Sequence, residues 1–179
     1  HGKLVLDKGV QIHTGSGDIE LASGGDLDFA DSNAAIFSAG SSAGHGTLEG
    51  DWLSGFSGNY PVRGGDVTLT VAGNIHGAGT EQLISDWLHR MGNFGGDLTN
   101  NVAMNTAWAV NFRDAGDERL FKQGLGAFGG GRLKVDVEGQ IDQLSAVVPT
   151  TGRPEGVYSG VVDNGFITNE VKVLGSGGA

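Results

Sequence analysis

The sequence predicts an all-β fold, a right-handed parallel β-helix with about 22–24 residues in each coil. Three observations support this prediction: an excess of glycine, apolar residues at every second position between the glycines, and segments that repeat along the chain. Glycine accounts for 34 of 179 residues, with only three prolines and no Gly-X-Y period, which excludes collagen. Glycine between β-forming residues indicates tight bends that join short strands.

The clearest repeat unit is GGDVTLTVAGNI at residues 64–75. Residues 17–28 align with it at an offset of 48, and residues 130–141 align at an offset of 66. The shared frame is Gly, polar, apolar residues at every second position, then Gly, polar and apolar again. We interpret the first offset as two coils of 24 and the second as three coils of 22. Weaker candidate coils lie at 3–13, 34–40 and 156–173.

Residues 76–128 depart from this frame, and we expect them to form an excursion packed against the coil. Within it, the apolar residues of TEQLISDWLHRM (80–91) fall on one face of a helix, which predicts a helix at about 81–91. A second helical turn is expected at 117–123 and a strand at 106–112. We interpret the chain, 1–179, as a single β-helix segment of a larger protein.

Charge and composition argue against several kinds of partner and site. The formal net charge is −10 and the 11 Lys and Arg residues are scattered, which disfavours nucleic acid and anionic lipid as partners. The sequence has no cysteine, so disulfides and cysteine-ligated zinc are excluded. It has no run of about 18 apolar residues, so no transmembrane segment is expected. No cofactor is predicted.

Two motifs resemble ligand sites. GLGAFG at 124–129 satisfies G-x-G-x-x-G, but a dinucleotide site needs a strand before the motif and a helix after it, and here a strand pattern follows. GGDLDFADSN at 24–33 gathers Asp26, Asp28 and Asp31 without the spacing of an EF-hand or of a nonapeptide calcium repeat. We interpret both segments as bends of the coil and predict no metal site.

Carboxylates offer the remaining route to catalysis, because the five histidines show no metal-binding or catalytic spacing. Asp136, Glu138 and Asp142 could share one solvent face by alternation, as could Asp18 and Glu20. Outward strand positions usually carry charge in any case, so we favour a solvated face and predict no catalytic residues.

Trp52 and Trp87 are the candidate ligand contacts, because tryptophan stacks on sugar rings. Trp52 falls in an expected loop at 50–65, and Trp87 falls on the expected helix. The alternative is that the tryptophans seal the excursion onto the coil, and we favour this alternative.

Several segments together resemble the large bacterial exoproteins of the filamentous haemagglutinin type. They are GGDVTLTVAGNI, the related GGGRLKVDVEGQIDQLSAVVPTTGR at 129–153, and WAVNF followed by FKQGLGAFGGG. The stretch LSAVVPTTGR at 144–153 is the most specific of them. The resemblance extends from about residue 60 to the end, and more loosely over the N-terminal third. It implies a rod-like β-helix, exported by a two-partner secretion transporter and displayed at the cell surface or released.

The resemblance also implies a function in adhesion to host cells, other bacteria or matrix polysaccharide, with no catalytic motif. The sequence shows no N-terminal secretion domain, so we expect an internal or C-terminal piece of the rod. Two alternatives stay open. One is a β-helix polysaccharide lyase or hydrolase, and the other is the inert stalk of a contact-dependent toxin.

Overall fold

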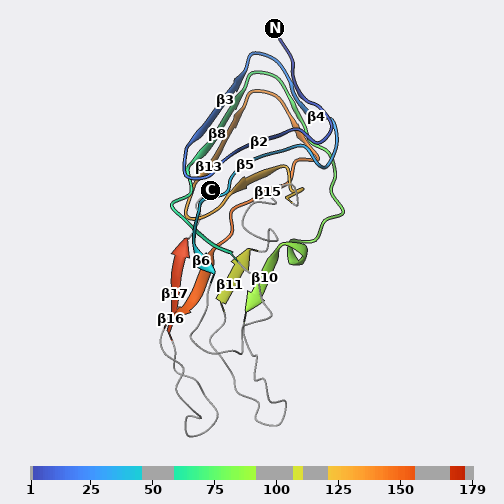
Figure 1. Ribbon diagram of the computed structural model, residues 1–179. Helices are drawn as coiled ribbons and strands as arrows, with labels where there is room; N and C mark the ends of the chain where they lie inside the picture. The colour runs from blue at the N-terminus through green and yellow to red at the C-terminus, as the bar shows by residue number, and fades with distance from the viewer. Residues whose placement is uncertain (1, 46–58, 92–106, 111–120, 156–169, 176–179) are drawn as a thin grey trace, which may run out of the picture.

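The structure, a computed structural model, describes residues 2–45, 59–91, 107–110, 121–155 and 170–175 (Figure 1). The described chain is mostly strand, and its one helical element is a short 3-10 helix, η2 (Ile84–Asp86). The strands are β1 (Leu4–Leu6), β2 (Gln11–Thr14), β3 (Ile19–Ser23), β4 (Leu27–Phe29), β5 (Ala35–Ser38), β6 (Ser41–His45), β7 (Asn59–Val62), β8 (Val67–Val71), β9 (Ile75–His76), β10 (Leu88–Met91), β11 (Ala107–Val110), β12 (Leu125–Ala127), β13 (Leu133–Val137), β14 (Ile141–Asp142), β15 (Ala146–Val147), β16 (Thr151–Glu155) and β17 (Glu170–Gly175).

Eleven of these strands form three parallel sheets. Sheet A has the order β1-β4-β9-β14, sheet B the order β2-β5-β12-β15, and sheet C the order β3-β8-β13. The chain visits the sheets in the order A, B, C and then returns to A, and we call each such passage a coil. In Figure 1 the three sheets lie along the three sides of a triangular outline. The predicted all-β class with parallel pairing is therefore confirmed.

The strand register confirms the sequence alignment but not its interpretation. Val67 in β8 lies beside Ile19 in β3 on one side and beside Leu133 in β13 on the other. The aligned segments are thus direct neighbours at both offsets, and each offset is one coil. Reading them as two and three coils was wrong, because insertions lengthen these coils. The first coil has no insertion, and there Leu4 pairs with Leu27 of the next coil. The number of residues between these two positions matches the coil length predicted from the sequence.

Two insertions leave the coils and meet in one antiparallel sheet. The first lies between β5 and β8 and carries β6 and β7, and the second lies between β9 and β12 and carries η2, β10 and β11. Because β11 pairs with both β10 and β7, the order β10-β11-β7-β6 joins the two insertions in what we call the side sheet. The antiparallel pair β16–β17 follows the last coil. In Figure 1 the side sheet and this pair lie outside the triangular outline. The excursion expected at 76–128 contains the second insertion, but β12 within that range belongs to sheet B.

The helix predicted at about 81–91 is absent. Its centre is η2, and β10 follows and pairs with β11, which confirms the strand expected at 106–112 over its described residues. Leu83 and Ile84, which were to line the apolar face, are 65% and 50% exposed, whereas Trp87 is buried. An eleven-residue helix is marginal without a buried face, so strand pairing prevails here. Most of the turn expected at 117–123 lies outside the described residues.

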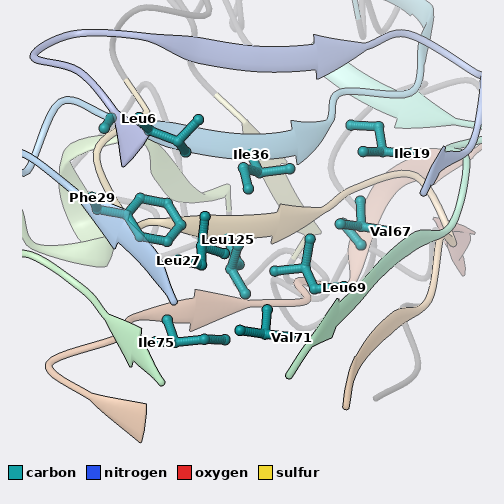
Figure 2. Packing of buried hydrophobic residues seen from close by; sticks show 12 residues of the cluster. Leu6, Ile19, Leu27, Phe29, Ile36, Val67, Leu69, Val71, Ile75 and Leu125 are labelled. Atoms are coloured by element: carbon teal, nitrogen blue, oxygen red, sulfur yellow. The ribbon is translucent and has the colours of Figure 1, made fainter. Parts of the chain in front are cut away.

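The core lies inside the coils and draws side chains from all three sheets. Val67, Leu69 and Val71 are almost fully buried, as the alternation in β8 predicts, while Thr70 is exposed. Figure 2 shows these side chains directed toward those of the other two sheets. The further buried members of the cluster are Leu6, Ile19, Leu27, Phe29, Ala34, Ile36, Ile75, Leu125 and Ala127.

The polar residue before each strand of sheet C links one coil to the next. The Asp66 backbone N–H donates to Asp18 Oδ1 at 2.8 Å, and the Arg132 N–H donates to Asp66 Oδ1 at 2.9 Å. Each carboxylate therefore satisfies a backbone donor in the following coil at a corner where the strand ladder begins. This explains why the repeat frame places a polar residue between its glycine and its first apolar residue.

Candidate functional site

The outward face of sheet C carries the candidate site. Successive side chains of a strand point to opposite faces, so every second residue of β3, β8 and β13 faces away from the core. The register sets these residues in rows across the sheet. One row holds Glu20, Thr68 and Lys134, and the next holds Ala22, Thr70 and Asp136.

At the C-terminal ends of these strands the face is hollowed into an open groove of about 600 Å³. The first two strands and the residues after them give the groove small side chains, whereas β13 and the residue after it give two valines and two carboxylates. The lining residues are Ala22, Ser23, Gly24, Thr70, Val71, Ala72, Val135, Asp136, Val137 and Glu138. The groove therefore has a floor of small side chains and one acidic edge.

The acidic edge is exposed and carries one internal ion pair. Lys134 Nζ lies 2.8 Å from Asp136 Oδ2, and both side chains are more than half exposed. The hydrogen bond with Asp136, and then the charge of that carboxylate, raise the pKa of the Lys134 ammonium above its usual value. Glu138 is also exposed, and among the described residues no cation pairs with it. The arrangement can accept hydrogen bonds and attract a cation.

The structure brings together some of the carboxylates singled out from the sequence and separates others. Asp136 and Glu138 both line the groove. Asp142 lies on β14 in sheet A, beside His76, and so does not share their face. Asp18 is engaged by the backbone of the next coil. Glu20 is exposed on the same sheet face as Asp136, in the row that ends with Lys134.

Trp87, a candidate ligand contact, is fully buried in an aromatic cluster. Its ring meets Phe121 edge-on at a centroid distance of 5.6 Å and Phe128 at 5.5 Å, and Phe37 of β5 packs against both phenylalanines. Trp87 thus packs the second insertion onto the coils, which is the alternative favoured from the sequence. Trp52, the other candidate, lies outside the described residues.

A hydrogen-bond network beside this cluster fixes the insertion to the last coil. The Lys122 N–H donates to Gln82 Oε1 at 2.9 Å, and Gln123 Nε2 donates to the Gln82 carbonyl at 2.7 Å. Ser145 Oγ donates to Gln123 Oε1 at 2.9 Å. Since Gln123 is 4% exposed, these bonds satisfy an amide that would otherwise be costly to bury.

The three aspartates that suggested calcium have structural partners. Asp26 Oδ1 accepts from the Asn74 N–H at 2.8 Å, and Asp28 forms an ion pair with Lys3. Asp31 Oδ1 accepts from the backbone N–H groups of Gly9, Asn33 and Ala34 at 3.0–3.1 Å. No group of three or more His, Asp or Glu residues suited to a metal ion occurs in the described parts of the chain.

Asp31 is also the acid most clearly held in its charged form. The hydrogen bond from the Asn33 side chain, and then that from the Gly9 N–H, lower the pKa of the Asp31 carboxyl below 3.8. This residue therefore closes a turn between β4 and β5 rather than presenting free oxygens to an ion.

The G-x-G-x-x-G motif at 124–129 lies on strand β12 of sheet B. Gly124 and Gly129 bound the strand with φ angles of 70° and 66°, and a side chain at Gly126 would come within 2.8 Å of the Phe121 ring. Here the glycines give the bends and the space for the aromatic cluster.

The sequence did not identify the floor of the groove as part of a site. Ala22, Thr70 and Asp136 occupy equivalent positions in the three aligned repeats, and small outward residues at two of these positions were the available signal. That signal has meaning only when the three strands are known to be neighbours.

No family model, curated protein or solved structure matches this chain. The structure contains, within the residues it describes, no helix of the length and hydrophobicity that crossing a membrane requires.

Proposed function

We propose that this chain is a structural segment of a bacterial adhesin, surface-displayed or secreted, of the filamentous haemagglutinin type, in which the coils form a right-handed parallel β-helix. The observation that carries the proposal is the in-register stacking of three parallel sheets that the chain visits in the same order in each coil. Such a stack buries a core only between neighbouring coils, so it grows as a rod. A rod holds binding parts away from a cell.

The right hand of the helix is supported by a general rule of chain topology. A crossover connection between parallel strands of one sheet is right-handed in about 98% of cases, a preference that follows from the right-handed twist of the strands. Every step from one strand of sheet A to the next is such a connection, made here through sheets B and C.

The side sheet is where we place specificity. It combines strands from two insertions, and the aromatic cluster around Trp87 fixes it to the coils. A feature built on a rigid rod by insertions can vary without disturbing the coils, as binding loops do on other scaffolds. We propose that its ligands are polysaccharides or cell-surface receptors. The full-length protein would leave the cell through a two-partner secretion transporter.

Binding of the labelled chain to bacterial and host cells and to a glycan array tests adhesion, and cryo-electron microscopy of the parent protein tests the rod. Saturable binding together with a right-handed rod supports the proposal. A rod that binds nothing instead supports an inert stalk of a toxin, and a compact parent protein contradicts the rod.

The enzymatic alternative has one observation in its favour, the pair Asp136 and Glu138 in one groove. Incubation with a polysaccharide panel and detection of new reducing ends tests it. Turnover that is lost in Asp136→Asn or Glu138→Gln would replace the adhesin proposal with a polysaccharide-degrading enzyme.

A further inference from the structure

We propose that the groove at the C-terminal ends of sheet C binds an extended Lys- and Arg-rich segment of a partner protein. The inference goes beyond the proposed adhesin function, because it names a partner for the outward face of sheet C. Two properties of the groove support it, its floor of small side chains and its acidic edge, together with the negative charge of the whole chain.

The floor leaves space for an extended chain to lie across the strands. Its outward residues on β3 and β8 are no larger than threonine, and a methyl group added at Gly24 would meet no atom within 4 Å. The groove crosses three neighbouring coils, so an occupant can contact β3, β8 and β13 together. An extended segment can therefore reach all three strands at once.

The edge selects for positive charge. Asp136 on β13 and Glu138 directly after it are exposed, and only Asp136 has a cationic partner among the described residues, which is Lys134. An arginine guanidinium of the partner can displace the Lys134 ammonium from the Asp136 carboxylate or share that carboxylate with it, because a guanidinium binds a carboxylate through two parallel N–H bonds. The net charge of −10 attracts such a segment from a distance.

The small apolar residues complement the rest of a basic side chain. The stems of Lys and Arg bury along apolar surface while their heads reach polar groups. Ala22 and Ala72 on the floor offer apolar surface to such a stem, and Glu138 at the edge offers a carboxylate to its charged head. Among the described residues that line the groove none is aromatic, so a sugar would find no stacking surface there, and we therefore favour a peptide over an amino-sugar polymer.

The test is fluorescence anisotropy of a labelled (Arg-Ala)4 peptide with the isolated chain, with (Gln-Ala)4 as the uncharged probe. The Asp136→Asn/Glu138→Gln variant should weaken binding about tenfold, the equivalent of ~1.4 kcal/mol. The matched control Asp7→Asn/Asp142→Asn removes the same charge from exposed sites outside the groove and should change affinity less than about twofold. Both proteins should keep the same far-UV circular dichroism.

A third variant predicts a gain. Lys134→Gln frees Asp136, so it should tighten binding of the arginine peptide. Equal weakening in both double variants, or no effect of Lys134→Gln, would reduce the result to non-specific charge attraction and overturn the proposal. Stronger binding of a glucosamine oligomer than of the peptide would overturn the assignment of the partner. These outcomes do not depend on surface display or on binding to cells, so they can be distinguished from a failure of the proposed adhesin function.

Discussion

Gly65 lies where two neighbouring coils pack too closely for any side chain. A Cβ atom there would overlap the Gly17 carbonyl oxygen, a backbone atom of the neighbouring coil. Gly65→Ala should therefore lower the free energy of unfolding by about 1–3 kcal/mol, because one of two packed backbones must shift. Urea unfolding measures this change. Gly24→Ala is the matched control, since no atom lies within 4 Å, and a similar loss in both variants would contradict the stacking described here.

Asp31 makes stability depend on pH in a defined direction. Its pKa is lower in the folded chain than the ordinary 3.8, so folding favours the charged form. The stability it contributes is fully present above pH 3.8 and is lost as the pH falls through the lower, folded-state value. Asp31→Ala should thus lower the melting temperature at pH 7, and this difference should shrink on acidification. A difference that stays constant between pH 7 and pH 2.5 would contradict a role for the carboxylate charge.

At the scale of elements, Trp87 decides how the second insertion is attached. Its ring is fully buried against Phe121 and Phe128, so Trp87→Ala should cost about 3–5 kcal/mol of folding free energy. Thermal unfolding followed by near-ultraviolet circular dichroism reports both the stability and the order of the cluster. Leu83→Ala, at a 65% exposed position of the same segment, should change stability by less than about 0.5 kcal/mol. An equally small effect at Trp87 would mean that the cluster does not hold the insertion.

The same segment shows why some elements could not be predicted from the sequence. Local apolar spacing favours a helix around Trp87, but its partners Phe121 and Phe128 lie far along the chain, beyond the reach of any local pattern. The strand that follows has its partner at β11, and these long-range contacts override the local period. In contrast, β3, β8 and β13 were predictable, because alternation and corner glycines act within each short segment.

The candidate site divides in the same way. Asp136 and Glu138 stand out in the sequence as alternating charges on one strand. Ala22 and Ala72 have no meaning until the register places them beside β13, so the floor of the groove depends on packing across coils. For the same reason Asp142, equally prominent in the sequence, turns out to lie on another sheet.

For the whole molecule, the decisive quantity is the number of coils between repeats. Sequence offsets cannot distinguish one coil lengthened by an insertion from two short coils, whereas the two cases place residues at different distances. If Glu20 and Thr68 are direct neighbours, their strands are about 4.8 Å apart, within reach of a disulfide. If another coil lay between them, the separation would be about 9.6 Å, which is beyond that reach.

The chain has no cysteine, so this distance can be measured by cross-linking. Glu20→Cys/Thr68→Cys should form a disulfide under mild oxidation, detected as a mass loss of about 2 Da, and should raise the free energy of unfolding by up to about 4 kcal/mol because the bond closes a long loop. Glu20→Cys/Lys134→Cys joins positions that lie on the first and third strands of sheet C, and it should stay reduced. Oxidation of the second pair but not the first would contradict the register of sheet C and, with it, the groove and the proposed rod.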